Sequence, residues 1–409
     1  MSVKWKTKNA APPRALIKEA ASVIRATGDK GTSLTIGHSD FVCDALLGTI
    51  EHPYDLAAEV LHRHLLHVIA QAPRNQNTID PEIITKEFKR RCEEHLRKHF
   101  QYVLVTTVSL NKDQNLKRRH VDSCRVEFHR VVPKKYQTSR TKVIAQHYTH
   151  ELVEKEQFLC ACVHVNAPDE RTAFNRAMRA LDLLRSLWQL AHRRPINFLA
   201  SAAHLEFPSD ALMGLGPLHT LHRPTGAALP TTLWFERPYQ PMPPTGVPDL
   251  AATEASLTQL LSLLRRNPYV DHMTVALRSY ISAVDQHQQQ FRFLKLWVTL
   301  EALLKTDQAK LLIRRASFFY ENREYQRALL WSLRDARNFT AHKSGEAEGM
   351  EMKNFQFAEI IRHILMVFLR NPFREERVDK ILEMLSISDE QSIDEQIMRL
   401  RKIKRLLNG

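Results

Sequence analysis

The stretch FRFLKLWVTLEALL, residues 291–304, decides how the second half of this chain folds. Its apolar residues recur at the spacing of an α-helix and form a broad face, which carries a single acid, Glu301. A helix that is apolar over so much of its surface has to be covered by neighbouring elements. The stretch therefore predicts a helix packed within a helical domain.

The same texture continues on both sides of that stretch, with helix after helix and no convincing strand. We predict helices near residues 252–266, 269–288, 290–306, 308–321, 324–340, 353–370, 374–386 and 391–407. The last begins with SIDE (392–395), a capping-box pattern, and its Leu400, Ile403 and Leu407 keep helical spacing. We expect that helix to dock its apolar side, or to serve a dimer. Residues 251–409 are thus predicted to form an all-α domain.

The first half of the chain has the patterns of an α+β fold. Helices are predicted at 55–72, 80–100 and 166–191, and strands at 101–110, 124–132, 157–165 and 216–224. Asp80 is the expected N-cap of the second helix, and Pro81 its first residue. We therefore predict an α+β N-terminal domain of unknown fold over residues 1–235, with a sensing or regulatory role. The proline-dense ERPYQPMPPTGVPDL, residues 236–250, is the expected linker between the two domains.

Length and charge limit the class of protein. The chain has 409 residues, enough for two or three domains, and a formal net charge of +14. This excess of cations favours a polyanionic partner, because each Lys or Arg placed on a phosphate releases counterions. No run of about twenty apolar residues is present and no apolar segment follows the N-terminal lysines, so we expect no membrane span, no secretory signal and a cytoplasmic protein. Five cysteines without Cys-x-x-Cys spacing argue against a disulfide framework or a zinc ribbon.

One short motif points to chemistry. In RDARNFTAHKSGE, residues 334–346, four residues separate Arg337 from His342. This spacing alone carries little information, because a chain with 20 histidines and many arginines holds roughly two such pairs by chance. The surroundings distinguish this pair: Asn338 follows the arginine, the apolar helix with Glu301 lies upstream, and a further helix follows.

In this order of elements, the region from about residue 252 to residue 370 resembles the HEPN ribonuclease superfamily, and most closely its Apea-like branch. The resemblance implies a helical domain that forms a homodimer or a higher oligomer, in which two Arg-x4-6-His motifs face each other and cleave RNA without a metal or another cofactor. By motif position, it implies catalytic roles for Arg337, Asn338 and His342, and a supporting role for Glu301. It also implies a regulated toxin or an effector of antiviral defence against phage.

These residue types suit metal-independent RNA cleavage. A histidine with a pKa of about 6.5 can take the proton of the 2′-hydroxyl or give one to the leaving 5′-oxygen. An arginine is always charged, and its planar fork stabilises charge on a phosphate. We therefore expect His342 to act as general base or acid and Arg337 as a phosphate clamp, with Arg334 and Lys343 binding RNA.

The spacing of the motif limits how Arg337 and His342 can meet. Residues five apart on an ideal helix are about 140° apart around its axis, so either the helix loosens near 339–341 or the pair is assembled across a dimer.

A different class of function fits the same residues: a catalytically inactive HEPN-like module that binds RNA or a protein through its positive surface. Other sites have less support. HRHLLH, residues 62–67, offers three histidines, but His62 and His64 point about 200° apart on a helix, and the stretch holds no carboxylate or cysteine. No Walker A loop, dinucleotide fingerprint, Gly-x-Ser-x-Gly or His-Glu-x-x-His motif is present, so neither nucleotide-dependent nor metal-dependent chemistry is expected.

Overall fold

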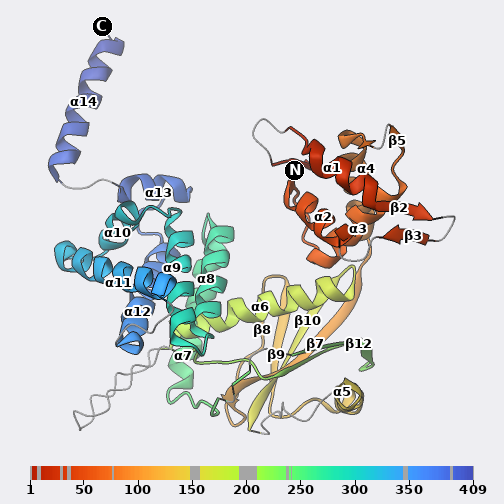
Figure 1. Ribbon diagram of the computed structural model, residues 1–409. Coiled ribbons are helices and arrows are strands. Elements are labelled where there is room, and N and C mark those ends of the chain that lie inside the picture. The colour runs from red at the N-terminus through yellow and green to blue at the C-terminus, as the bar shows by residue number, and fades with distance from the viewer. Residues whose placement is uncertain are drawn as a thin grey trace.

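The computed structural model describes residues 2–6, 11–27, 31–34, 38–75, 78–147, 157–192, 210–235, 239–240, 242–343, 349–386 and 390–408. In these residues the first half of the chain mixes helices with strands, and the second half is helical (Figure 1). This confirms the predicted change of texture along the chain. Among the described residues, no helix combines the length and the apolar character that a membrane crossing requires.

The first part of the chain, up to Leu96, folds around a small core of its own. Its described residues form α1 (Arg14–Val23), α2 (His38–Gly48), α3 (Ala58–Gln71) and α4 (Pro81–Leu96), with the strand pairs β1 (Lys4–Trp5) and β4 (Ile50–Glu51), β2 (Ile24–Thr27) and β3 (Gly31–Leu34), and β5 (Arg74–Asn75) and β6 (Thr78–Ile79). The apolar faces of the helices meet at Leu46, Leu65 and Phe88, which are fully buried. Asp80 caps α4 as predicted, because its Oδ1 accepts a hydrogen bond from the amide of Glu82 at 2.9 Å.

An antiparallel sheet follows this N-terminal part. Its strands, in spatial order, are β12 (Ala228–Phe235), β11 (Leu218–His222), β7 (Phe100–Asn111), β10 (Phe158–Ala167), β9 (Cys124–His129) and β8 (Arg119–Val121). The central strands β7 and β10 pair along their whole length, from Phe100 opposite Ala167 to Asn111 opposite Phe158. The four strands predicted in this region are β7, β9, β10 and β11. Two strands, β8 and β12, had no predicted counterpart.

Different helices cover the two faces of the sheet. Because successive side chains of a strand point to opposite faces, Ala161 of β10 faces the long helix α6 (Glu170–Ala191), while Cys160 and Cys162 face α5 (Lys134–His147). The two cysteines thus share one face and pack there. All five cysteines of the chain are free and buried.

The second half of the chain consists of α7 (Leu250–Arg266), α8 (Val270–Val284), α9 (Gln289–Leu304), α10 (Ala309–Ser317), α11 (Arg323–Lys343), α12 (Met350–Arg370), α13 (Val378–Leu385) and α14 (Glu390–Asn408). Each corresponds to a predicted helix, with ends that differ by a few residues. Helix α9 is central, because α8, α10, α11 and α12 all pack against it. Its Phe293, Leu296 and Leu300 are fully buried, as the broad apolar face of residues 291–304 predicts.

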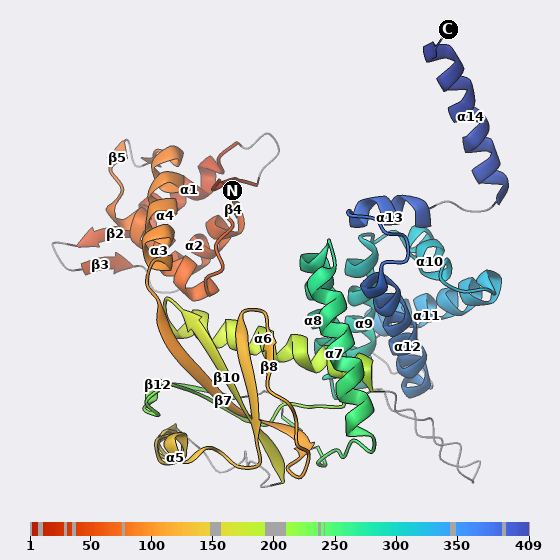
Figure 2. The same ribbon diagram turned by 180° about the vertical axis from the view of Figure 1, so that it is seen from behind.

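Helix α6 joins the sheet to these helices. Figure 2 shows α6 passing from the sheet to the region of α7 and α8, against which it also packs. A single buried cluster consequently extends from Tyr102 of the sheet through Trp188 of α6 to Leu385 of α13. Val247, inside the predicted linker at 236–250, is buried in the same cluster. The buried clusters thus place the sheet together with the C-terminal helices, whereas the predicted boundary at 236–250 separates them. That two domains fold separately on either side of this boundary stays a prediction.

The last helix stands apart from the rest of the molecule. Figure 1 and Figure 2 both show α14 projecting beyond α13. Its Leu400, Ile403 and Leu407 keep the predicted helical spacing, but all three are exposed. The expectation that this helix docks its apolar side on its own chain is therefore wrong, since no element in the described residues covers that side.

Candidate functional site

The predicted Arg-x4-His motif lies on α11, a helix with clearly separated buried and exposed faces. Leu330, Leu333 and Thr340 are buried where α11 packs on α9 and α10. Asn322 precedes the helix, and its Oδ1 accepts a hydrogen bond from the amide of Tyr325 at 3.0 Å, which satisfies one free donor of the first turn. This packing determines which positions of α11 can reach a ligand.

The helix does not loosen within the motif. It continues as α-helix to Lys343, so the positions of Arg337 and His342 differ by about 140° around its axis. Arg337 is half-buried, and its Nη1 donates a hydrogen bond to Asn338 Oδ1 at 3.2 Å. The side chains of His342 and Lys343 lie outside the described residues. Of the two arrangements considered above, loosening within one chain is therefore wrong, and assembly across two chains stays a prediction.

The exposed side of α11 combines an aromatic ring with polar and charged groups. The Arg334 guanidinium lies 5.0 Å from the centroid of the Trp331 ring, and its Nη1 lies 3.8 Å from Asp335 Oδ1. Trp331 is 38% exposed, so its ring is open to further stacking. Asn338 lies one turn after Arg334, and the position of His342 one turn after Asn338. Sequence reasoning missed Trp331, although its spacing of three residues from Arg334 already placed the two side chains on one side of the helix.

Glu301 lies on α9, the helix against which α11 packs. Its Oε1 accepts a hydrogen bond from Nε1 of Trp297, one turn earlier, at 2.7 Å. Among the described residues, no ion pair joins Glu301 to Arg337. The structure thus brings the two helices together without joining these two side chains, and the supporting role of Glu301 stays a prediction.

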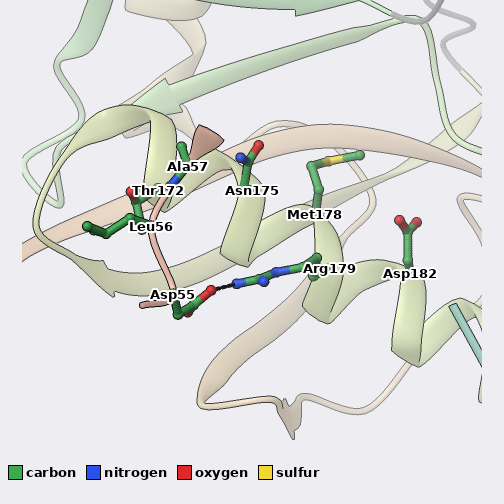
Figure 3. Close-up of a pocket in the computed structure, with 8 residues that line it drawn as sticks. All are labelled: Asp55, Leu56, Ala57, Thr172, Asn175, Met178, Arg179 and Asp182. Atoms are coloured by element: carbon green, nitrogen blue, oxygen red, sulfur yellow. Dashed lines mark hydrogen bonds and ion pairs between the residues drawn. The ribbon is translucent and has the colours of Figure 1, made fainter. Parts of the chain in front are cut away.

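A second polar site lies where the N-terminal part meets α6. A cavity of about 240 Å³ lies between residues 55–57 and one side of α6. Figure 3 shows Asp55 directed at Arg179 beside it. Arg176 Nε donates a hydrogen bond to Asp55 Oδ2 at 2.7 Å, and Arg179 Nη2 donates one to Asp55 Oδ1. Burial raises the pKa of Asp55, but the two guanidiniums outweigh burial and lower it overall. Because both arginines are already paired with a carboxylate, we interpret this site as a contact between parts of the chain.

A third polar group is buried between the sheet and α5. Arg140 Nη1 donates hydrogen bonds to the carbonyl of Val105 at 2.8 Å and to Thr220 Oγ1 at 2.6 Å. His222 Nε2 lies 2.8 Å from the same Thr220 hydroxyl, and its Nδ1 lies 3.3 Å from Ser139 Oγ. These contacts all lie within the fold, and both Arg140 and His222 are buried. We therefore interpret the network as structural.

The buried histidine makes stability depend on pH. Burial lowers the pKa of His222 to about 4. The pKa of a histidine in the unfolded chain is about 6.5, so the unfolded state binds more protons between these two values. Stability is therefore fully present above about pH 6.5 and falls as the pH decreases toward 4. We expect this group alone to lower the free energy of unfolding by about 2 kcal/mol between pH 7 and pH 5.

Urea unfolding of the wild type and of His222→Gln at pH 7 and pH 5 measures this contribution. The variant should lose less stability on acidification than the wild type does. Some acid sensitivity should remain, because burial also lowers the pKa of His64 to about 4. His363→Gln, which changes an exposed histidine of α12, should behave as the wild type. An equal loss in the wild type and in His222→Gln would contradict this account.

The histidines of the HRHLLH stretch lie on α3. His62 Nε2 is 3.8 Å from Asp40 Oδ1 and 3.6 Å from Asp44 Oδ1, two carboxylates of α2 that the sequence did not place beside it. His64 instead packs its ring against that of His95, with centroids 4.9 Å apart. Across the described part of the chain, no three His, Cys, Asp or Glu side chains are grouped so that they could hold a metal ion.

Comparison of the chain with protein-family models, with curated proteins and with solved structures finds no match. The exposed face of α11 is therefore chosen as the candidate site on two grounds only, its geometry and the sequence motif.

Proposed function

We propose that this chain is a metal-independent endoribonuclease whose active site is built on α11. The observation that carries this proposal is the exposed face of α11, where Trp331 and Arg334 stack and Asn338 lies next to Arg337. An open aromatic ring beside guanidinium groups can stack a base of a single strand while the cations meet its phosphates. The motif order that resembles HEPN ribonucleases and the net charge of +14 support the same reading.

The chemistry needs three tasks from these residues. His342 takes the proton of a 2′-hydroxyl, and the 2′-oxygen attacks the adjacent phosphorus. The bond from phosphorus to the 5′-oxygen breaks and that oxygen takes up a proton, which leaves a 2′,3′-cyclic phosphate and a 5′-hydroxyl. Arg337 stabilises the charge that develops on the phosphoryl oxygens. Asn338 orients Arg337, since its Oδ1 accepts the hydrogen bond from the guanidinium.

A second copy of the chain completes the site in this proposal. The positions of Arg337 and His342 lie about 140° apart around one helix, and one histidine cannot serve at once as the base and as the acid. A homodimer that apposes two α11 helices supplies a second histidine by symmetry. Arg334 and Lys343 then bind the RNA strand on either side, and Glu301 supports α11 from α9.

The cellular role follows from the activity. An enzyme that destroys RNA in the cytoplasm has to be held inactive until it is needed. We infer a regulated toxin or an effector of antiviral defence, with the residues before α7 as the regulatory part. This step rests on the resemblance to HEPN proteins and on the large share of the chain outside α7–α14.

The second candidate function is an inactive module that binds RNA or protein. The stacked Trp331 and Arg334 favour this reading, because stacking and cationic contacts suffice for binding without any proton transfer. The two functions differ in whether the bound strand is cut.

Matched RNA and DNA oligonucleotides, incubated with the purified chain in excess chelator, test the proposal. We expect cleavage of RNA only, because the 2′-hydroxyl is the nucleophile. Products should carry cyclic phosphate and 5′-hydroxyl ends, and a single 2′-O-methyl group should block cleavage at its own position. Equal cleavage of DNA, or loss of RNA cleavage on chelation, would reject this mechanism. Binding without cleavage under all conditions would favour the inactive module.

A further inference from the structure

Helix α14 exposes an apolar stripe along its length. Ile397, Leu400, Ile403 and Leu407 are 40%, 64%, 51% and 80% exposed. In proteins, most of the stability of a helix comes from packing of its apolar face. A contiguous exposed apolar stripe marks an interaction surface. We therefore expect a partner outside the described residues of the same chain to cover the stripe.

The charges of α14 indicate which partner fits. Acidic residues lie toward its beginning and basic residues toward its end: Glu390, Asp394 and Glu395, then Arg399, Arg401, Lys402, Lys404 and Arg405. Two such helices side by side in the same direction would place like charges at the same level. In opposite directions, the acidic beginning of each helix lies beside the basic end of the other. Opposite charges on neighbouring helices stabilise one pairing direction and disfavour the other.

The apolar stripe has the symmetry that antiparallel pairing of identical helices requires. Ile397 and Ile403 lie three residues before and after Leu400, and Ile393 and Leu407 lie seven residues before and after it. A two-fold axis near Leu400 therefore brings apolar positions of both copies to the same levels. Both the charges and the apolar positions thus complement a second α14 that runs in the opposite direction.

We propose that α14 pairs in antiparallel orientation with α14 of a second copy of this chain, with the pair centred close to Leu400. This inference goes beyond the ribonuclease proposal and holds whether or not the chain cuts RNA. The pairing surface is separate from α11, because Figure 1 shows α14 projecting from the far side of α13. One chain can therefore use both surfaces, and assembly can then continue beyond a dimer.

The molecular mass of the full chain, measured by sedimentation equilibrium, tests the pairing. Leu400→Lys places two charges at the centre of the apolar contact, and we expect it to raise the dissociation constant of the pair at least about a hundredfold. The mass should then fall to that of a monomer, or to that of a dimer if a second contact between chains, such as the one proposed on α11, remains. Met398→Lys is the matched control, because Met398 is 62% exposed and lies on the opposite side of the helix from Leu400. A wild-type monomer at tens of micromolar, or unchanged mass in Leu400→Lys, overturns the proposal.

Cross-linking of full-length chains tests the direction of pairing. Gln396→Cys and Lys404→Cys lie four residues either side of Leu400, and the five native cysteines are buried. A short bismaleimide should join the two variants when they are mixed, and should join neither variant to itself. Self-cross-linking of the single variants would indicate parallel pairing, and absence of any cross-link would indicate no pairing. Either result overturns the proposal, without bearing on RNA cleavage by α11.

Discussion

Replacement of Arg337 or His342 with alanine is expected to lower the rate of RNA cleavage at least about a hundredfold in each case. Removal of His342 takes away the proton transfer, and removal of Arg337 takes away the charge that stabilises the phosphorane. Arg337 is half-buried and bonds to its neighbour Asn338, so its loss should leave the packing of α11 in place. Single-turnover cleavage of a labelled RNA, with circular dichroism of each variant, measures both effects.

Two matched substitutions control for loss of charge and for loss of a histidine. Arg323→Ala lies on the same helix, about 21 Å from Arg337 along its axis, and should cleave at the wild-type rate. His363→Ala lies on the exposed side of α12 and should also leave the rate unchanged. If either control lost as much activity as the motif variants, the effect would come from overall charge or stability and not from a site on α11.

Mixed dimers distinguish how the two chains share the site. If two copies of His342 act as base and acid, an excess of His342→Ala chains should suppress the activity of co-expressed wild type. If instead Arg337 of one chain works with His342 of the other, co-expression of Arg337→Ala with His342→Ala should restore part of the activity. Unaffected activity in the first mixture and none in the second would place a complete site within one chain.

The helices of the second half were predictable because local pattern and burial agree there. The apolar positions of residues 291–304 follow the helical period, and α9 is buried on most sides, so the pattern reports the environment directly. In the first half, capping residues such as Asp80 and Asp169 define helix starts through a local signal, because their side chains accept hydrogen bonds from amides of the first turn.

Helix α5 was missed because a charged residue takes a core position. Its buried side chains are Tyr136, Arg140 and Val143, which do keep helical spacing. A search for apolar periodicity passes over Arg140, because its burial depends on acceptors on distant strands, Val105 and Thr220. No local signal in the sequence announces those partners.

The sequence predicted the position of the candidate site but not all of its residues. The Arg337 motif placed the site on α11, but the neighbouring Trp331 was overlooked because an aromatic residue at helical spacing usually belongs to the core. Only the orientation of α11 against α9 and α10 shows that this ring is exposed. The stripe of α14 presents the same difficulty, since its spacing defines an apolar side but not what covers it.

Replacement of Arg185 is expected to cause the largest loss of stability. Arg185 of α6 is 1% exposed; its Nε donates a hydrogen bond to the carbonyl of Met213 at 2.7 Å and its Nη1 donates one to Asp182 at 2.8 Å. Its Nη2 donates to Asp285, the C-cap residue that follows α8. Burial alone would lower the pKa of Arg185, but the two carboxylates raise it. Arg185→Met removes the guanidinium and leaves all of these acceptors without their donor, so we expect the free energy of unfolding to fall by about 3–5 kcal/mol.

Arg179→Met is the matched control, because Arg179 also lies on α6 and pairs with a carboxylate, Asp55, but both partners are far more exposed. Exposed pairs contribute about 1 kcal/mol or less, so this variant should remain close to the wild type in urea. Similar losses in the two variants would contradict the argument from burial.

The same variant tests whether the sheet and the helices unfold together. Arg185 joins α6, which lies on the sheet, to the end of α8, and a single buried cluster covers both regions. If that shared core is one cooperative unit, Arg185→Met should lower hydrogen-exchange protection in β10 and in α9 by similar amounts. If the segment at 236–250 separates two domains that fold alone, protection should fall around α6 while α9 keeps its own. The outcome decides whether α11 is carried by an autonomous helical domain or by a fold that includes the sheet.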